Sequence, residues 1–142
     1  KQDKYLNLAS NLNLHKRIIF LGKMPHIQNL LSAVDVAVLP AFYDPASRFT
    51  LEAIAAGKPV ITTKFNGATD LFTDNRHGLI IDTPENISAL AEAICRFTKK
   101  DNIRKAAEAI AADNLREKVS IARVAQQLIP VYASILERRR QR

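Results

Sequence analysis

Short runs of β-branched residues alternate with helical patterns over the first 82 residues. The runs are apolar and bounded by Gly, Pro or Asp, which is typical of buried strands, and the segments between them have apolar residues at helical spacing. This order predicts an α/β fold with a parallel sheet, right-handed crossovers and helices on both faces. The expected strands are Arg17–Gly22, Asp35–Pro40, Pro59–Thr63 and Gly78–Asp82, and the expected helices are 27–33, 48–57 and 68–74.

From Thr83 onward the sequence predicts helices alone. Thr83 suits an N-cap, Pro84 suits the first helical position, and acidic Glu85 falls in the first turn. Further helices are expected over 101–114 and 115–140, and Pro130 is where the last could bend, since proline lacks the N–H donor. We therefore expect an α/β domain over residues 1–115 and a C-terminal helix with a basic tail over 116–142.

Composition excludes several classes of protein. The 142 residues fit one domain, with 47% apolar and 25% charged residues and no long uncharged apolar run, so no transmembrane helix is expected. A single cysteine, Cys95, rules out a disulfide within the chain, and its apolar helical pattern predicts a buried side chain. His15, His26 and His77 lie in separate segments without ligand-like spacing, so they are interpreted as loop or surface histidines and no metal is expected. A reducing, cytoplasmic setting is the simplest interpretation.

The formal charge of +7 is weak evidence for an anionic partner. Much of the excess lies in the tail Glu137–Arg142, and no basic stripe is interleaved with aromatic rings, so nucleic acid is not expected. A solvated tail is the first interpretation. Peripheral contact with an anionic membrane, at its inner face, is the second.

Two carboxylates flank the start of the helix expected near Ser47. In an open parallel sheet, ligands bind outside the carboxyl ends of the strands, and Asp44 lies in one such loop. Glu52 falls in an apolar helix, where an ionised carboxylate needs a partner. That partner is either Arg48, four residues earlier, or the paired hydroxyls of a ligand such as a ribose. We favour the ligand, although Asp44 before a proline also suits an ordinary turn.

The start of this helix suits an anion. The unpaired N–H groups of Ser47, Arg48, Phe49 and Thr50, together with the positive end of the helix dipole, would accommodate a group such as a diphosphate. Asp44 would then lie at one side of the anion and Glu52 at the other.

The stretch PAFYDPASRFTLEAIAAGKPV resembles a motif of the retaining, nucleotide-sugar-dependent glycosyltransferases of family 4, which have the GT-B fold. The family's two acidic residues are separated by seven others, as Asp44 and Glu52 are. Segments resembling those on either side of the motif also occur here, so the likeness covers nearly the whole chain. The matching residues are Pro40, Tyr43, Pro45, Leu51, Glu52, Ala53, Ala55, Gly57, Pro59 and Val60.

The resemblance implies a role for each candidate residue. Glu52 would bind the ribose and Asp44, as the catalytic-site carboxylate, would contact hydroxyls of the donor sugar. Backbone groups of Ser47, Arg48, Phe49 and Thr50 would hold sugar and diphosphate, and the loop 22–26, with Gly22, Lys23 and Met24, would border the base. Preorganised N–H donors would stabilise the departing diphosphate without a metal or other cofactor.

The sequence also departs from the family pattern. Asp44 stands where Glu is usual, and Ser47 replaces a glycine that lets the chain approach the sugar closely. The segment carrying the family's Arg and Lys, and the acceptor-binding domain before it, are not found here. By this resemblance, residues 1–115 would be a partial nucleotide-sugar-binding, Rossmann-like domain without its first strand and helix. We therefore expect a fragment that covers the C-terminal half of a GT-B fold, ends in a long helix and is inactive alone.

Three functions fit this resemblance. The first is the donor-binding part of a hexosyltransferase acting on a glycan or glycolipid, as in polysaccharide or lipopolysaccharide biosynthesis. The acceptor would bind through the missing N-terminal domain. The alternatives are a nucleotide-sugar 2-epimerase of the same fold and a module that binds nucleotide sugars without turnover. The spacing of Asp44 and Glu52 favours the transferase over the epimerase.

Overall fold

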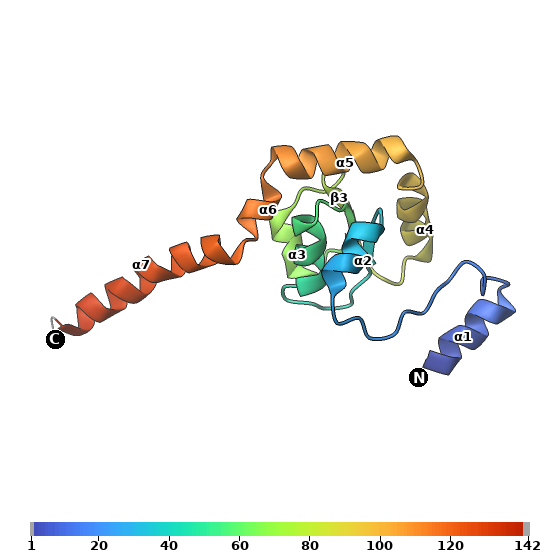
Figure 1. Cartoon of the computed structure of the whole chain (residues 1–142), viewed down its shortest axis with the longest axis horizontal. Coiled ribbons are helices and arrows are strands. Elements are labelled where there is room, and N and C mark those ends of the chain that lie inside the picture. The colour runs from blue at the N-terminus through green and yellow to red at the C-terminus, as the bar shows by residue number, and fades with distance from the viewer. Residues whose placement is uncertain (1, 141–142) are drawn as a thin grey trace.

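The computed structural model describes residues 2–140 and shows a three-stranded parallel sheet flanked by helices (Figure 1). This arrangement confirms the predicted α/β class. The elements, in order, are α1 (Gln2–Asn11), α2 (Ile27–Ala33), β1 (Ala37–Leu39), α3 (Arg48–Ala55), β2 (Val60–Thr63), the 3₁₀ helix η1 (Gly67–Leu71), β3 (Gly78–Ile81), α4 (Ile87–Arg96), α5 (Lys100–Ala112), α6 (Leu115–Lys118) and α7 (Ile121–Arg140).

The strands follow one another in space as they do in sequence, in the order β1–β2–β3. Ala37 lies opposite Val60 in the first ladder, and Val60 lies opposite Gly78 in the second. Gly78 is required here, because a Cβ at this position would come within 2.1 Å of the Val60 carbonyl oxygen. The parallel order places the loops after β1, β2 and β3 at one edge of the sheet.

Alternate residues of β2 face two separate hydrophobic clusters, as expected for a strand covered on both faces. Val60 packs in one cluster with Leu31 of α2 and Ile54 of α3. Ile61 packs in the other with Ala93 of α4 and Ala106 of α5. Helices therefore cover both faces of the sheet, as the sequence predicted.

The prediction of a strand over Arg17–Gly22 is wrong, because these residues form a turn followed by irregular structure. The N–H groups of Arg17 and Ile18 both donate to the Leu14 carbonyl, which forms a turn, and the residues that follow are irregular. The apolar side chains from Ile18 to Leu21 are exposed. A β-branched run becomes a strand only beside a backbone that accepts its hydrogen bonds, and no described strand lies alongside this one.

Three predicted helices differ in type or extent. The expected helix 68–74 is the 3₁₀ helix η1, started by the Asn66 side chain, which accepts from the Ala68 N–H. Helix α4 begins four residues after Thr83, because Asn86 accepts from the Ala89 N–H and takes the capping role. Thr83 instead accepts from the Glu85 N–H within a turn.

The expected single helix 115–140 is two helices, α6 and α7. They separate at Ser120, whose hydroxyl accepts from the Arg123 N–H at 3.2 Å and so starts α7 afresh. Pro130 lies inside α7. Gly57, by contrast, ends α3 as predicted, with a positive φ of 74° that suits glycine.

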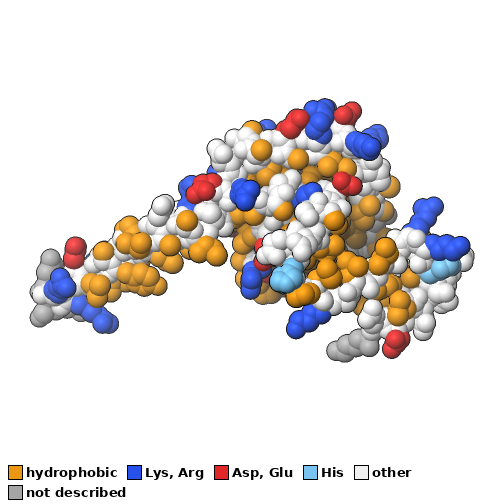
Figure 2. Space-filling view, viewed as in Figure 1, with side chains coloured by type: hydrophobic (Ala, Val, Ile, Leu, Met, Phe, Trp, Pro, Cys, Tyr) orange, Lys and Arg blue, Asp and Glu red, His pale blue; other side chains and the backbone are white. Residues whose placement is uncertain are grey.

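Helices α1 and α7 extend away from the body of the molecule (Figure 1). No residue of α7 is buried, and Figure 2 shows apolar side chains gathered along one side of it. The exposed apolar residues of α7 include Ile121, Val124, Leu128 and Ile135. Within residues 2–140, no helix has the length and apolarity needed to span a membrane. The prediction for the basic tail falls partly on residues 141 and 142, which lie outside the described residues.

Cys95 is exposed rather than buried, which corrects the sequence-based expectation. It lies in α4, whose buried residue is Ala93. A helix of this kind presents one apolar stripe to the core, and Cys95 falls outside that stripe.

Candidate functional site

Helix α3 begins at the predicted position, in the loop that follows β1. Ser47 is buried and acts as N-cap, because its hydroxyl oxygen accepts from the Thr50 N–H at 3.3 Å. The Ser47 N–H itself donates to the Asn66 side-chain oxygen at 3.4 Å. Two of the four predicted anion-binding N–H groups are thus occupied by protein. Among the described residues, the N–H groups of Arg48 and Phe49 have no recorded acceptor.

Asp44 belongs to a loop that pairs with the residues after β2. Its N–H donates to the Phe65 carbonyl at 3.1 Å, and its own carbonyl accepts from the Gly67 N–H at 2.8 Å. The side chain is partly buried, and its Oδ1 accepts from the Ala46 N–H at 3.2 Å. The carboxylate is therefore held three residues before the N-cap of α3.

Glu52 is more accessible than its apolar helix suggested. Its side chain is 33% exposed, and one oxygen lies 3.6 Å from a guanidinium nitrogen of Arg48, whose side chain is 91% exposed. Both partners considered from the sequence remain compatible with this position. A pair so open to water contributes little to stability, so Arg48 leaves the Glu52 carboxylate available to a ligand.

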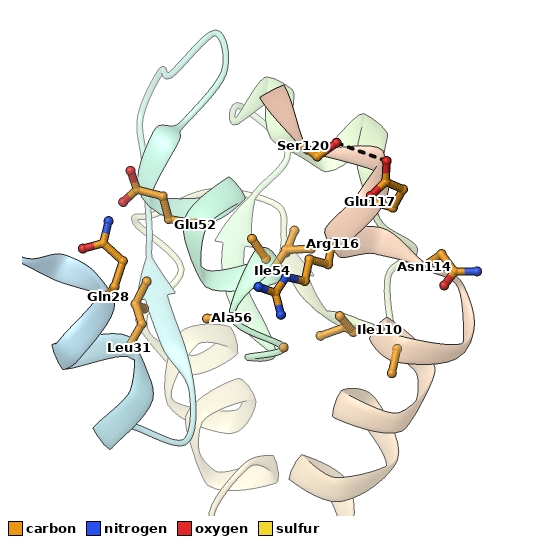
Figure 3. Close-up of a pocket in the computed structure, with 13 residues that line it drawn as sticks. Gln28, Leu31, Glu52, Ile54, Ala56, Ile110, Asn114, Arg116, Glu117 and Ser120 are labelled. Atoms are coloured by element: carbon orange, nitrogen blue, oxygen red, sulfur yellow. Dashed lines mark hydrogen bonds between the residues drawn. The ribbon is translucent and has the colours of Figure 1, made fainter. Parts of the chain in front are cut away.

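A cavity of about 860 Å³ opens beside α3, and Glu52 lies at its edge (Figure 3). Figure 3 shows Gln28 and Leu31 reaching it from α2, Ile54 from α3 and Arg116 from α6. Of the predicted site residues, Glu52 alone lines it. The other predicted site residues do not line this cavity. The cavity therefore does not coincide with the predicted site.

The predicted base-binding residues Gly22, Lys23 and Met24 lie in the exposed loop that leads into α2. Gly22 has a positive φ of 67°. Gln28, in the first turn of α2, lines the same cavity as Glu52. The loop therefore enters a helix that faces Glu52.

Asn66, for which no role was predicted, is fully buried just after β2. Its side chain hydrogen-bonds to Ser47, Thr50, Thr62 and Ala68. An Asn-Gly pair following a predicted strand was the signal available, because Asn often caps helices and turns. The partners, up to 19 residues away, could not be read from it.

His77 lies in the turn before β3, which agrees with the predicted loop position, but it is buried, with 2% of the residue exposed. Its Nδ1 accepts from the Thr73 N–H at 2.9 Å, so its Nε2 carries the hydrogen and faces Asp113 Oδ2 at 2.7 Å. Arg76 donates to both oxygens of Asp113 at 2.8 Å. The Arg76 and His77 hydrogen bonds hold the pKa of the Asp113 carboxyl well below its usual range. This cluster joins the turn before β3 to the end of α5.

No group of three or more potential metal-ligating side chains is found within residues 2–140. Among the described residues, the candidate site consists of a helix start with two N–H groups that have no acceptor, one carboxylate before the helix and one within it.

A family model described as "Glycosyl transferases group 1" matches residues 1–114. The chain is 33% identical over 96 residues to the UDP-Gal:alpha-D-GlcNAc-diphosphoundecaprenol alpha-1,3-galactosyltransferase of Escherichia coli, covering 68% of this chain and 24% of the relative. It is 31% identical over 104 residues to the lipopolysaccharide core biosynthesis glycosyltransferase LpsE of Rhizobium meliloti, covering 73% of this chain and 30% of the relative.

The fold has a counterpart among solved structures. Sucrose-phosphate synthase from Thermosynechococcus elongatus superposes with a TM-score of 0.81 at 27% identity, covering 95% of this chain and 34% of that protein. The chain thus spans about a third or less of the length of these proteins.

Proposed function

Because the chain belongs to the group 1 glycosyl transferases, we propose that it is the donor-binding part of a retaining enzyme. The donor is a nucleoside diphosphate sugar, and the acceptor is a glycan or glycolipid. The structural likeness to sucrose-phosphate synthase also confirms the predicted fold, the C-terminal half of a GT-B fold. This membership favours the transferase over the alternative functions considered above.

One observation carries the proposal: within the described chain, two N–H groups at the start of α3 have no acceptor, and they fall in sequence between the two carboxylates of the family motif. Arg48 and Phe49 supply the N–H groups, and these lie after the loop that fixes Asp44. Glu52 follows within the same helix with a third of its side chain exposed. A diphosphate is one of the anions that such a helix start can bind.

Each carboxylate has a separate role in this proposal. Glu52 accepts hydrogen bonds from the ribose hydroxyls, because an ionised carboxylate can accept two side by side. Asp44 contacts the hydroxyls of the sugar. The N–H groups stabilise the negative charge that develops on the departing diphosphate, and this stabilisation needs no metal.

The acceptor part of the proposal rests on a relative. The E. coli protein's name specifies UDP-Gal as donor and a diphosphoundecaprenol-linked GlcNAc as acceptor, which is a lipid-linked sugar. This chain matches only 24% of that protein's length. We infer that the acceptor of our protein is likewise lipid-linked and is bound by a region outside these 142 residues.

Titration calorimetry of the chain with UDP, GDP and ADP tests donor binding. Glu52→Gln should weaken binding of the preferred nucleotide by about 1.5–3 kcal/mol, the scale of a hydrogen bond to a charged group. Glu108→Gln is the matched control, since Glu108 also pairs with an arginine four residues earlier, at 2.9 Å, but lies on α5. Equal affinities for Glu52→Gln and wild type would refute the ribose role, and no binding by wild type would refute donor binding.

Steady-state kinetics of the complete protein that carries this chain separate the two carboxylates. Asp44→Asn should lower turnover while nucleoside diphosphate affinity stays nearly unchanged, because a contact made chiefly in the transition state affects the rate constant. If Asp44→Asn loses as much nucleotide affinity as Glu52→Gln, the division of roles is wrong.

A further inference from the structure

We propose that Asn66 is the positioning residue of the donor site: it fixes the start of α3 so that the N–H groups of Arg48 and Phe49 are left for the donor diphosphate. This inference rests on the proposed function. Asn66 does not itself touch the donor, because it is fully buried. Its effect passes through the hydrogen bonds of its side chain.

The Asn66 side chain uses its whole hydrogen-bonding capacity on four partners. Its Oδ1 accepts from the N–H groups of Ser47 at 3.4 Å and Ala68 at 3.1 Å. Its Nδ2 donates to the hydroxyl oxygens of Thr50 and Thr62, both at 3.0 Å. An amide has two acceptor lone pairs and two donor hydrogens, so this arrangement specifies asparagine rather than aspartate or leucine.

The four partners come from different parts of the site. Ser47 and Thr50 belong to the first turn of α3, and Ala68 belongs to η1. Thr62 is the third residue of β2, and its hydroxyl donates to the Leu39 carbonyl at the end of β1 at 2.8 Å. Asn66 therefore joins α3 to the carboxyl ends of two neighbouring strands.

The residue after Asn66 fixes the loop that carries Asp44. The Gly67 N–H donates to the Asp44 carbonyl at 2.8 Å. A Cβ on Gly67 would come within 1.9 Å of the Pro45 carbonyl oxygen, so only glycine allows this approach. Two consecutive residues thus hold the two sides of the candidate site. Asn66 holds the helix start, and Gly67 holds the Asp44 loop.

This geometry selects which amides can face a ligand. Asn66 Oδ1 accepts a hydrogen bond from the Ser47 N–H, and the Ser47 hydroxyl oxygen accepts one from the Thr50 N–H at 3.3 Å. The two N–H groups between them, those of Arg48 and Phe49, are the ones without a recorded acceptor in the described chain. Loss of the Asn66 side chain would release the Ser47 N–H and let the helix start turn, so the effect should fall on the diphosphate.

The experiment compares a nucleoside diphosphate with its own nucleoside on Asn66→Ala, Asn66→Asp and wild type. The probe is whichever of UDP, GDP and ADP binds wild type, paired with uridine, guanosine or adenosine, in NMR titrations. Asn66→Asp keeps the shape and both acceptor contacts, but it adds a negative charge beneath the helix start. Asn102→Ala is the control, because the Asn102 side chain donates to the Arg96 carbonyl at the end of α4 and, within the described chain, has no hydrogen bond to α3.

We expect both Asn66 variants to weaken diphosphate binding at least tenfold while nucleoside binding changes less than twofold. The Arg48 and Phe49 amide signals should shift in the free variants. A general loss of structure would weaken both ligands equally, and Asn102→Ala should weaken neither. The inference is overturned if both ligands weaken equally or if diphosphate affinity is unchanged. If Asn66→Ala does not fold, Asn66→Asp alone decides, and absence of binding by wild type instead overturns the proposed function and this inference with it.

Discussion

Two polar clusters in this protein join segments that are distant in sequence, and they differ in charge and burial. The Asn66 cluster is neutral and buried, and it links α3, β2 and η1. The Asp113 cluster contains Arg76 and the buried His77, and it links the turn before β3 to the end of α5. The first lies beside the candidate donor site. The second lies among residues for which no ligand role is proposed.

The clusters differ in charge because they differ in their access to water. A neutral amide can occupy a buried place without a desolvated charge, and its two donors and two acceptors fix direction. A charged pair gains more from each hydrogen bond but keeps its cost low only where water reaches it. Asp113 accordingly has 31% of its side chain exposed, and Arg76 has 50%. We infer that the Asn66 cluster governs site geometry, whereas the Asp113 cluster governs stability.

The largest effect is expected from Gly67→Ala. The new methyl group would meet the Pro45 carbonyl oxygen and displace the Asp44 loop, which should cost about 3 kcal/mol of stability and weaken nucleotide binding at least tenfold. Gly78→Ala is the matched control, because its methyl would meet the Val60 carbonyl oxygen at 2.1 Å, within the sheet. Urea denaturation and calorimetry should show both variants destabilised but only Gly67→Ala impaired in binding under folded conditions. Equal loss of affinity in both would erase the contrast between the regions.

His77→Ala should lower stability by about 2 kcal/mol, because it empties a buried position and leaves the Thr73 N–H without its acceptor. Nucleotide affinity should not change. His15→Ala, at an exposed position, provides the control and should be nearly neutral in the same urea titration. A selective loss of nucleotide binding in His77→Ala would mean that the Asp113 cluster also governs the site.

Asp113→Asn should destabilise the protein less than His77→Ala, and by an amount that depends on pH. Folding lowers the pKa of Asp113, so its carboxylate stabilises the fold above its unfolded pKa of about 4. This contribution is lost as the pH falls from there toward the folded pKa. Thermal unfolding at pH 7, 5, 4 and 3 should therefore show a gap between wild type and variant that is full at neutral pH and shrinks in acid. A gap of constant size from pH 7 to 3 would contradict the ionic role of this cluster.

Asn86→Ala should have the smallest effect, about 0.5–1 kcal/mol. Asn86 also starts a helix, but its side chain accepts from the Ala89 N–H alone, at an exposed position, and such caps contribute about this much. Thermal denaturation measures the loss, and nucleotide titration should show none. If Asn86→Ala matches Asn66→Ala in both measurements, the additional partners of Asn66 have no separate role.

Local patterns in the sequence predicted most elements of the fold and the positions of the candidate residues. The runs 35–40, 59–63 and 78–82 contain the three strands, and Ser47 and Gly57 delimit α3 as expected. These features depend on side-chain spacing and on backbone preferences of single residues. Asp44 and Glu52 flank the helix start for the same reason, because the Ser47 N-cap places Asp44 in the preceding loop and Glu52 within α3.

Tertiary structure decided everything that depends on a partner far along the chain. Arg17–Gly22 has the composition of a strand but lacks a neighbouring backbone to pair with, and no local pattern reveals that. The division of the last helical region at Ser120 is, by contrast, a local effect that the helical pattern did not reveal, because the Ser120 hydroxyl accepts from the Arg123 N–H three residues later. The four contacts of Asn66 arise where the segment after β2 meets the start of α3, and the burial of His77 arises where the turn before β3 meets the end of α5. Spacing along a chain determines which residues share a face, whereas hydrogen-bond satisfaction inside the protein depends on which segments fold together.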